Sequence, residues 1–365
     1  MTNTKKIVCT VTNDLSNDQR MLRICQTLAT SGFQVTLVGR NRPFSKPLDN
    51  RDFHQKRLNC WFDKGKFFYL EYNIRLFFFL LFHDFDIINA VDLDTILPCL
   101  FVSKIKTKKI VFDAHEYFSE VPEVVSRPRI KKIWENIGDF AIPKMDACYT
   151  VGNSLAQIFS ERYKIPFSVI KNVPFQTKIK KTGKSETKIM IYQGALNEGR
   201  GLEQMINALK KLPPQYVFWI VGDGDLSDNL KKQANKLELG DQVVFWGMQS
   251  IEDLKTITLQ ADVGINLLEN KGLSYYYSLA NKSFDYIQAN LPAINIAFPE
   301  YIALNQLFET SILCPDLSEQ SILESIEKIF DTTTYFHLQQ QCEEAAKVLN
   351  WEQEKEELLR IYAKL

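Results

Sequence analysis

The sequence lacks the histidine and cysteine clusters that bind zinc. Its seven cysteines are scattered without a C-x-x-C pair, and it contains only four histidines. Neither pattern fits a zinc site. No signal peptide is recognisable at the N-terminus, so the cysteines are expected to be reduced thiols in a cytoplasmic protein.

An excess of one charge and a long apolar run are also absent. Lysine plus arginine and aspartate plus glutamate number 44 each, so the chain has no overall field that would attract nucleic acid. No apolar segment is long enough to span a bilayer, and the protein is expected to be soluble or at most peripheral at the inner membrane face. Its 365 residues, 45% hydrophobic and 24% charged, are typical of two globular domains.

A third absence concerns the N-terminal βα turn. Residues 6–11 are predicted as a strand, 19–30 as an amphipathic helix and 35–38 as a second strand, which is a Rossmann-like start. The turn between the first strand and the helix has no G-x-G-x-x-G motif. A dinucleotide clasp is therefore disfavoured here, and the polar loop 13–20 is a candidate to face a second substrate.

Alternating strand and helix patterns continue along the chain and predict parallel sheets. Further strands are expected at 87–91, 109–113, 147–151, 168–171, 188–193, 216–221, 242–246, 263–268 and 292–297. Helices are expected at 130–140, 154–162, 202–212 and 226–237, with an amphipathic helix at the C-terminus. Ligands of open parallel sheets bind at the carboxyl ends of the strands, so a cleft between two Rossmann-like halves is where chemistry is expected.

A lysine-rich stretch without apolar periodicity divides the two halves. The predicted organisation is an N-terminal domain over residues 1–174, a linker over 175–187 and a C-terminal domain over 188–345. Residues 346–365 are predicted to form a helix that crosses back to the N-terminal domain.

The most aromatic segment is KFFYLEYNIRLFFFLLF, residues 66–82. Its second half is apolar on all sides, which is typical of a helix buried on every face. The alternative is a helix that dips into a membrane interface near a lipid-linked acceptor, with lysines at 64 and 66 beside it. The pattern alone leaves both interpretations open.

Two segments are candidate phosphate sites. In residues 262–296 a helix over 281–288 begins from a loop that follows a buried strand, and unpaired N–H groups at a helix N-terminus favour anions. The loop GALNEGRG, residues 194–201, has the same position after a strand, and Arg200 could pair with phosphate oxygens. Each segment can also be read as an ordinary βα connection with a solvated polar loop.

The order of these motifs resembles that of family 4 glycosyltransferases. It comprises YQGALNEGRGLEQMINAL, VFWIVGDG, VVFWG, ADVGINLL and LANKSFDYIQANLPAI, preceded by DAHEYFSEVPEV and VIKNVP and followed by WEQEKEELL. The resemblance covers nearly the whole chain. It implies the GT-B fold, with two Rossmann-like domains whose parallel sheets face a cleft, and a retaining sugar transfer from a nucleotide diphosphate sugar without a cofactor.

The resemblance also implies roles for individual residues. Arg200 matches the residue that clamps the donor diphosphate, and His115 matches the histidine that reaches the transferred sugar and the leaving phosphate. Both are the candidate catalytic residues. The implied donor-binding residues are Gly194, Arg200, Trp246, Gly247, Met248, Tyr277, Asn281, Lys282 and Asp285, with Asp285 on the ribose and residues 246–248 at the base. Asn172 matches an asparagine near the domain boundary.

Three positions depart from the family pattern. Ala195 replaces an arginine that commonly follows the loop glycine, so Arg200 would act with less help. Tyr277 stands at the first glutamate of the E-x7-E motif, and the second glutamate is the shorter Asp285. These changes leave the identity of the donor sugar undetermined.

Asp92-Leu93-Asp94 and Asp223-Gly224-Asp225 have the D-x-D spacing of metal–diphosphate sites. Because this spacing is frequent by chance, no metal is predicted. Asp92 and Asp94 are instead expected to cap a helix that begins at Thr95.

The leading hypothesis is a metal-independent hexosyltransferase that acts on a glycan or lipid-linked acceptor in surface polysaccharide synthesis. Retention is explained by same-face attack, so no dedicated nucleophile is expected. The acceptor-side candidates are Asp18, Arg20, Glu116 and Glu120. The alternatives are a nucleotide-sugar epimerase of the same fold and a non-catalytic protein that binds sugar nucleotides.

Overall fold

A computed structural model describes residues 4–16, 18–177 and 187–365. The chain forms two compact units. The N-terminal unit comprises Met1–Asn172 together with Glu354–Leu365, and the C-terminal unit comprises Val173–Gln353. The predicted linker 175–187 lies largely outside the described residues. Among the described residues, no helix combines the length and apolar character that crossing a membrane requires.

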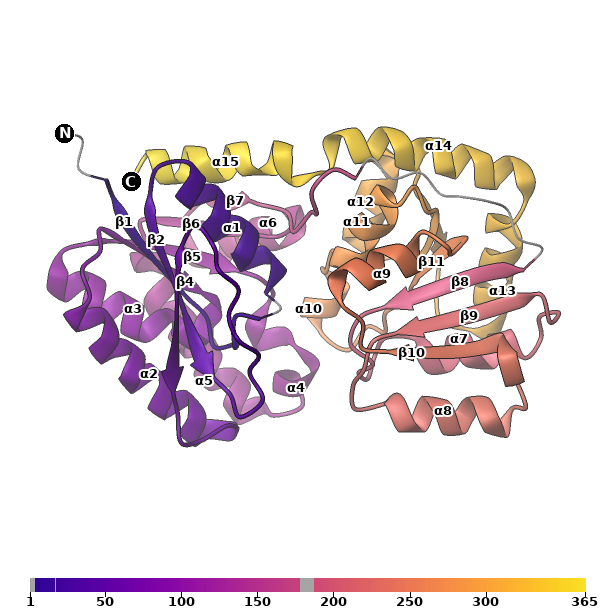
Figure 1. Ribbon diagram of the computed structural model, residues 1–365, viewed down its shortest axis with the longest axis horizontal. Helices are drawn as coiled ribbons and strands as arrows, with labels where there is room; N and C mark the ends of the chain where they lie inside the picture. Colours follow the sequence, from indigo (N-terminus) through magenta and orange to yellow (C-terminus); the bar gives the residue numbers. More distant parts are fainter. Residues whose placement is uncertain (1–3, 17, 178–186) are drawn as a thin grey trace. The chain divides into compact units, whose positions relative to one another are not determined.

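The N-terminal unit is built on a parallel sheet in the order β3-β2-β1-β4-β5-β6-β7. Its strands are β1 (Lys6–Thr10), β2 (Gln34–Asn41), β3 (His54–Asn59), β4 (Ile87–Val91), β5 (Lys109–Ala114), β6 (Ala147–Thr150) and β7 (Phe167–Val169). Its helices are α1 (Gln19–Thr30), α2 (Gly65–Phe82), α3 (Asp92–Lys106), α4 (Pro122–Val125), α5 (Pro128–Ala141) and α6 (Asn153–Tyr163), with short 3-10 turns at Phe118–Glu120 and Ile142–Lys144. Helices α2, α3 and α5 cover one face of this sheet, and α1 covers the other (Figure 1).

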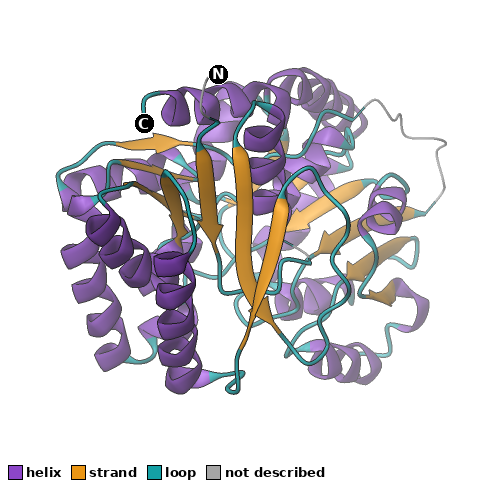
Figure 2. Cartoon of the chain, turned by 60° about the vertical axis from the view of Figure 1, so that its left-hand side comes forward, coloured by secondary structure: helices purple, strands orange, loops and turns teal. Residues whose placement is uncertain are grey.

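The C-terminal unit has a second parallel sheet, in the order β10-β9-β8-β11-β12-β13. Its strands are β8 (Lys188–Gln193), β9 (Tyr216–Val221), β10 (Val243–Gly247), β11 (Val263–Asn266), β12 (Ala293–Ile296) and β13 (Ser311–Cys314). Its helices are α7 (Leu202–Leu209), α8 (Ser227–Lys236), α9 (Ile251–Thr258), α10 (Leu273–Tyr276), α11 (Asn281–Gln288), α12 (Pro299–Leu307), α13 (Glu319–Ile329) and α14 (Thr332–Val348), with a 3-10 turn at Gly240–Gln242. Figure 2 shows the strands of both sheets between layers of helices.

Both sheets have the strand order of doubly wound folds, in which the first strand lies inside the sheet and the chain winds outward in both directions. The prediction of two Rossmann-like, parallel-sheet halves is therefore confirmed. The central strands are buried along their whole length, as in β4 and β11, and this is why they appear in the sequence as continuous apolar runs.

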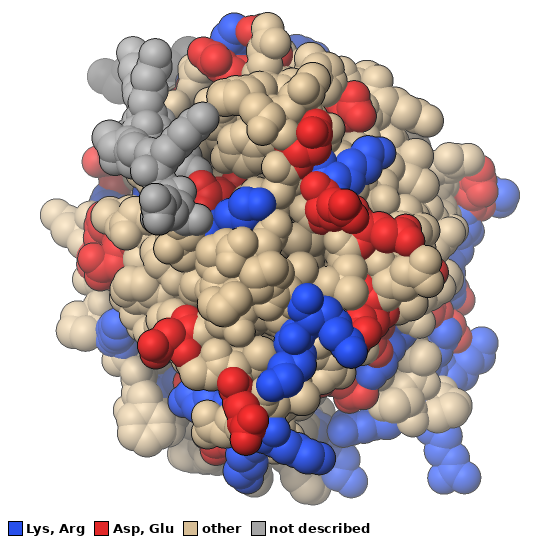
Figure 3. Space-filling model, turned by 90° about the vertical axis from the view of Figure 1, so that its right-hand side faces the viewer, with Lys and Arg blue, Asp and Glu red and all other residues tan. Residues whose placement is uncertain are grey.

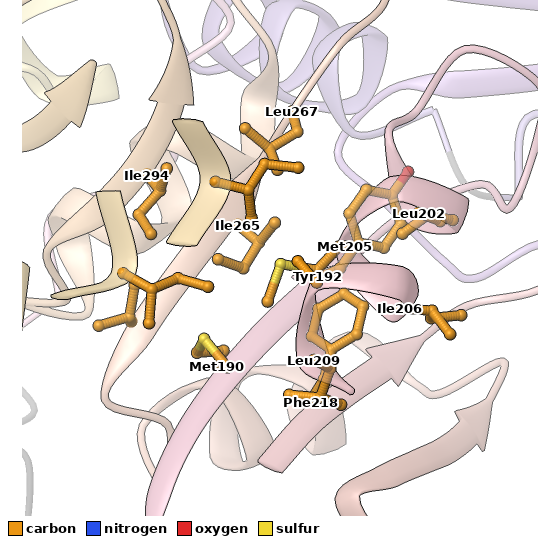
Figure 4. Packing of buried hydrophobic residues seen from close by; sticks show 14 of the residues in the cluster. Met190, Tyr192, Leu202, Met205, Ile206, Leu209, Phe218, Ile265, Leu267 and Ile294 are labelled. Carbon is orange, nitrogen blue, oxygen red and sulfur yellow. The ribbon is translucent and has the colours of Figure 1, made fainter. Parts of the chain in front are cut away.

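A large apolar core fixes the loop that follows β8. Tyr192 at the end of β8 packs with Leu202 and Met205 at the start of α7, and Leu267 lies in the same cluster after β11 (Figure 4). All four side chains are at most 2% exposed. The two ends of loop 194–201 are thus held by buried side chains, so the loop's backbone is positioned by the core.

The structure corrects the predicted C-terminal helix. The chain does not form one helix over residues 346–365, because α14 ends at Val348 and α15 (Trp351–Ala363) begins after a short break. Trp351 is fully buried at the start of α15, and its N–H donates to Pro174 O at 2.8 Å. Residues from Glu354 onward belong to the N-terminal unit, where Tyr362 packs against Phe33 with ring centroids 6.4 Å apart.

The aromatic helix α2 differs from the interpretation of a helix buried on every face. Only one stripe is buried, formed by Phe68, Tyr72, Leu76 and Leu80 at intervals of four residues. Of the other apolar side chains, five are exposed, namely Phe67, Leu70, Ile74, Phe78 and Phe82, and the rest are half-buried. The apolar residues of α2 therefore form an exposed apolar surface as well as a contact with the core.

Candidate donor and catalytic sites

Three glycine loops at the carboxyl ends of β8, β9 and β10 lie in backbone contact. Gly222 has a φ of +139°, and a Cβ added there would lie 1.9 Å from Gly194 O. The N–H of Gly222 donates to Gly247 O at 2.9 Å, and the N–H of Gly194 donates to Val221 O at 3.0 Å. A side chain at Gly222 would push these loops apart, so glycine is required there for the close approach.

Arg200 is placed by the second end of the β8 loop. The next residue, Gly201, has a φ of +67°, and a Cβ there would lie 2.6 Å from Leu267 O. The guanidinium carbon of Arg200 lies 4.6 Å from the ring centroid of Tyr275. Its Nε is buried and has no hydrogen-bond partner among the described residues. Arg200 is also the only arginine between residues 163 and 359. Its guanidinium is held against the Tyr275 ring, and its Nε–H remains available as a hydrogen-bond donor.

Lys282 lies at the second position of α11 and is only 8% exposed. Its ammonium nitrogen is 3.6 Å from the ring centroid of Tyr192 and 3.6 Å from where a Cβ of Gly194 would be. Burial lowers the pKa of Lys282 well below its ordinary value, and the charge of Arg200 lowers it further against the opposing effect of Asp285. The predicted Arg200, Lys282 and Gly194 are therefore brought together by the fold.

Asp285 lies one turn after Lys282 on α11. Its Oδ2 accepts a hydrogen bond from Gln193 Nε2 at 3.0 Å, and Gln193 Oε1 in turn accepts from Thr258 Oγ1 at 2.8 Å. Two further predicted donor residues lie at the start of this segment: Asn281 is exposed at the first position of α11, and Tyr277 is half-buried after α10.

The predicted base-binding residues lie at the end of β10. Trp246 packs edge-on against Trp219 with ring centroids 5.2 Å apart. Its indole N–H is buried and has no partner among the described residues. Gly247 turns the chain with a φ of +65°, and the Met248 side chain is 74% exposed beyond it. The strand end thus presents the unpaired indole N–H of Trp246 and the exposed apolar side chain of Met248.

His115 follows β5 in the N-terminal unit. Its Nε2 lies 3.0 Å from Asp113 Oδ2, and its backbone N–H donates to Asp92 Oδ1 at 2.9 Å. Burial disfavours the charged imidazole, but the carboxylate of Asp113, with a smaller contribution from Asp92, outweighs it and raises the pKa of His115 to about 9. His115 is therefore an imidazolium at neutral pH, able to hold a negative charge.

Arg20 corrects one acceptor-side prediction. Its side chain is 2% exposed and donates from Nη2 to Asp113 Oδ1 at 2.9 Å and from Nη1 to Ile170 O at 2.7 Å. Although burial opposes ionisation of Asp113, Arg20 and His115 hold the pKa of its carboxyl below the usual value. Arg20 therefore supports the carboxylate that orients His115 and does not face an acceptor.

The other acceptor-side candidates have different surroundings. Asp18 caps α1 by accepting from Met21 N–H at 3.0 Å, as its position before an apolar helix predicts. Glu120 is 8% exposed and forms an ion pair with Lys131, so its carboxylate is already compensated. Glu116 is exposed next to His115. Of the four candidates, Glu116 is the best placed to meet a ligand.

The expected helix cap at Asp92 and Asp94 is wrong. Helix α3 begins at Asp92, and both aspartates lie in its first turn. Asp92 accepts from the His115 backbone, and Asp94 Oδ2 accepts from Thr12 Oγ1 at 2.6 Å. In the second D-x-D, Asp223 Oδ1 accepts from Gly224 N–H and Ser227 Oγ. Within residues 4–16, 18–177 and 187–365, no group of three or more histidine, cysteine or acidic side chains is arranged to hold a metal ion.

The sequence pattern missed the partners of these residues. Asp113 and His115 are two apart at the end of one strand, so their side chains share a face, and this spacing could have indicated the pair. The rings of Tyr192 and Tyr275, which hold Lys282 and Arg200, come from a strand end and a short helix. No local pattern links these positions, because the fold alone brings them together.

Comparison with known proteins assigns the family. The family model "Glycosyl transferases group 1" matches residues 174–348, and the model "Glycosyltransferase Family 4" matches residues 19–174. A curated relative, the alpha-monoglucosyldiacylglycerol synthase of Streptococcus pneumoniae, is 28% identical over 122 residues. That match covers 30% of this chain and 27% of the relative, so it spans about a quarter of the relative's length.

Solved structures match the whole fold. Sucrose-phosphate synthase from Thermosynechococcus elongatus has a TM-score of 0.80 at 14% identity, covering 99% of this chain and 98% of that one. HepE of Anabaena, in complex with UDP and glucose, has a TM-score of 0.78 at 14% identity, covering 99% and 100%. The architecture is that of GT-B glycosyltransferases. The chain belongs to the family 4 type of glycosyltransferase, with a group 1 domain in its C-terminal half.

Proposed function

We propose that the protein transfers a hexose from a nucleotide diphosphate sugar to a glycan or lipid-linked acceptor, in surface polysaccharide synthesis. The observation that carries the proposal is the cation pair of Arg200 and Lys282 beside Gly194. The charge of half-buried Arg200 adds to burial in disfavouring the ammonium form of Lys282, and a diphosphate would relieve that repulsion. The N-terminus of α11 adds unpaired N–H groups directed at the same anion.

The proposed donor is supported by solved relatives of this fold. The Anabaena protein was crystallised with UDP and glucose, and UDP-glucose is therefore the first donor to test. Asp285 would accept hydrogen bonds from the ribose, and Trp246 would donate its free indole N–H at the base side. Tyr277, Asn281 and Met248 would line the remainder of the donor site.

The acceptor is proposed from the relative's name and from the protein surface. The curated relative is a glucosyldiacylglycerol synthase, which supports a lipid-linked acceptor. The outward face of α2 carries Phe67, Leu70, Ile74, Phe78 and Phe82, each at least 49% exposed. We propose that this face contacts the inner membrane surface as a peripheral site, since aromatic and aliphatic side chains partition into the interface.

In the proposed reaction His115 holds the developing charge on the leaving phosphate or orients the transferred sugar. An imidazolium fixed by Asp113 is a preorganised donor for a group that becomes negative in the transition state. Arg200 would stabilise the departing diphosphate. We propose that the anomeric configuration is retained, by attack on the face from which the diphosphate leaves, and that the anomeric proton couplings of the product by NMR will show it.

We propose that the reaction needs no metal ion. The carboxylates of Asp92, Asp94 and Asp223 accept hydrogen bonds from protein donors, so metal binding would have to displace those bonds. Turnover is expected to be unchanged by EDTA. Loss of turnover in EDTA that added Mg²⁺ or Mn²⁺ restores would contradict this.

A donor panel tests the function. The purified protein is incubated with UDP-glucose, UDP-galactose, UDP-N-acetylglucosamine and GDP-mannose, and release of the nucleoside diphosphate is measured. We expect release from at least one donor, with a loss of at least tenfold in His115→Ala. An epimerised sugar nucleotide as the product would favour the epimerase alternative. Binding of a donor without release or epimerisation would favour the non-catalytic one.

A further inference from the structure

Three helices of the N-terminal unit present a shared apolar surface, which we call the α2–α3–α5 surface. Its large exposed side chains are Phe67, Leu70, Ile74, Phe78 and Phe82 on α2, Phe101 and Ile105 on α3, and Ile130, Ile133 and Phe140 on α5. The three helices lie on the same face of the sheet (Figure 1). Exposed apolar areas of this kind mark interaction sites.

A groove of about 400 Å³ opens within this surface. It is lined by Tyr69, Leu70, Asn73, Ile74, Phe77, Phe78, Leu93, Asp94, Leu97, Pro98, Phe101, Trp134 and Ile137. Ten of these thirteen side chains are apolar, if Trp134 with its indole N–H is counted among them, and the other three are Tyr69, Asn73 and Asp94. The volume lies in the range of small-ligand pockets, and the lining is that of a hydrocarbon site.

The groove has one polar end. Asn73 Nδ2 donates to the backbone oxygens of Tyr69 and Asp94 at 2.8 and 2.9 Å, and the Asp94 carboxylate accepts from Thr12. Asp94 lies two residues after Asp92, which holds the His115 backbone. Asp94 thus links the polar end of the groove, through the first turn of α3, to the residue that holds the His115 backbone.

Aromatic contacts tie the groove wall to the loop after His115. The ring of Trp134 on α5 lies 5.6 Å from that of Tyr69 on α2 and 4.8 Å from that of Phe118. Phe118 is three residues beyond His115 in the chain. Trp134, itself a lining residue, thus connects the groove wall with the segment that follows His115.

Basic side chains flank the α2–α3–α5 surface. Lys66 lies 5.2 Å from the Phe67 ring centroid, and Lys144 lies 3.8 Å from that of Phe140. Lys104 on α3 and Lys132 on α5 are exposed on the same helices. By contrast, basic and acidic side chains are interspersed on the face in Figure 3. Apolar area bordered by lysines matches an anionic lipid surface better than it matches a neutral protein.

We propose that the groove binds a hydrocarbon chain of the acceptor, drawn from a lipid bilayer, with the acceptor's polar head at Asn73 and Asp94 beside His115. The inference rests on the proposed glycosyltransferase function and specifies its acceptor class as an amphiphile. The groove places apolar side chains beside Asp94, in the first turn of α3. The proposal distinguishes two kinds of binding: specific binding of the acceptor's hydrocarbon chain inside the groove, and general adsorption of a membrane on the surrounding surface.

Chain-length dependence tests the proposal. Hexyl, heptyl and octyl β-D-glucosides, each below its micelle concentration, are titrated into the full-length protein by calorimetry. Affinity should rise about fourfold per methylene, because each buried methylene contributes a fixed increment. Ile74→Glu places a charge in the groove and should abolish that increment. Ile105→Glu is the matched control: Ile105 is 61% exposed and Ile74 49%, but only Ile74 lines the groove.

Each outcome decides the question. Equal affinity for all chain lengths, or equal losses in both variants, would overturn the groove and leave only surface adsorption. Self-association that buries this surface and blocks the alkyl probes would overturn it in favour of a second copy of the chain. Leu70→Glu repeats the test if Ile74→Glu does not fold. UDP titrated into the same samples separates the two proposals, because donor binding without alkyl binding contradicts the groove alone.

Discussion

Burial disfavours the charged form of both His115 and Lys282, but the two residues differ in their charged neighbours. The carboxylate of Asp113 outweighs desolvation at His115 and raises its pKa to about 9. At Lys282 the neighbouring charge is Arg200, which adds to desolvation, so the pKa is lowered. The positive charge of His115 is balanced by Asp113 before any ligand binds. The positive charge of Lys282 is stabilised only when an anion binds, which is expected of a binding site.

The raised pKa of His115 predicts a pH-dependent stability. The ion pair contributes fully below the unfolded-state value of about 6.5 and is lost as pH rises through about 9. The difference in free energy of unfolding between the native protein and His115→Gln should shrink by on the order of 3 kcal/mol over that range. Urea unfolding at several pH values measures it. His337→Gln, on exposed α14, controls for loss of an imidazole, and a constant difference for His115→Gln would contradict the assignment.

Lys282 predicts proton uptake on donor binding. A bound diphosphate favours the ammonium form and raises the lowered pKa of Lys282. UDP-glucose should therefore bind with net proton uptake below the ordinary lysine pKa of about 10.4, in the range where Lys282 of the free protein is partly deprotonated. Calorimetry in buffers of different ionisation enthalpy measures the uptake. Lys282→Met should remove it, and binding without proton exchange in the native protein would exclude this role.

At the scale of elements, the sequence predicted the helices and strands that have a clear local pattern of apolar residues. The helix at 281–288 agrees with α11, and the central strands agree with their apolar runs to within a few residues. It missed β3, whose residues His54–Asn59 have no fully buried position, and it did not anticipate β13 or α12 to α14. As an edge strand, β3 buries too little of itself to leave a strong periodic signal.

The glycine contacts between strand ends predict a local effect on folding. Gly222→Ala places a Cβ 1.9 Å from Gly194 O at a φ of +139°. It should cost about 3 kcal/mol or more of unfolding free energy and weaken donor binding, because two loops must separate. Gly240→Ala, at a φ of +49° with open space around the added Cβ, should cost about 1 kcal/mol. Equal costs in chemical denaturation would show that the contact between loops does not matter.

At the scale of the whole molecule, the site residues come from two units with separate cores. The family resemblance carried Arg200, Lys282 and Asp285 to one edge of the second sheet, where the structure places them together. It could not show that Arg20 is buried, because an arginine at the start of an amphipathic helix is usually solvated. Nor could it decide between core and surface for α2, since the segment is apolar on nearly every side.

The outward face of α2 predicts binding to lipid vesicles by the whole protein. Flotation with vesicles containing an anionic phospholipid should recover the protein, and Phe78→Ser should weaken binding about tenfold, because a large apolar side chain is lost from the interface. Phe336→Ser is the matched control: Phe78 and Phe336 are 52% and 48% exposed, and Phe336 lies in α14 of the C-terminal unit. Equal recovery of all three proteins, or equal losses in both variants, would contradict the assignment of this face.

The central claim is that a sugar nucleotide's diphosphate binds between Arg200 and Lys282. Calorimetric titration of UDP into the native protein, Arg200→Ala and Lys271→Ala tests it most directly. Lys271 is already paired with Glu198 and Glu269 and serves as the nearby control. Arg200→Ala should weaken UDP binding about 10- to 150-fold, the effect of losing charge-assisted hydrogen bonds, and Lys271→Ala should change it less than about threefold. Equal UDP affinity in the native protein and Arg200→Ala would contradict the claim.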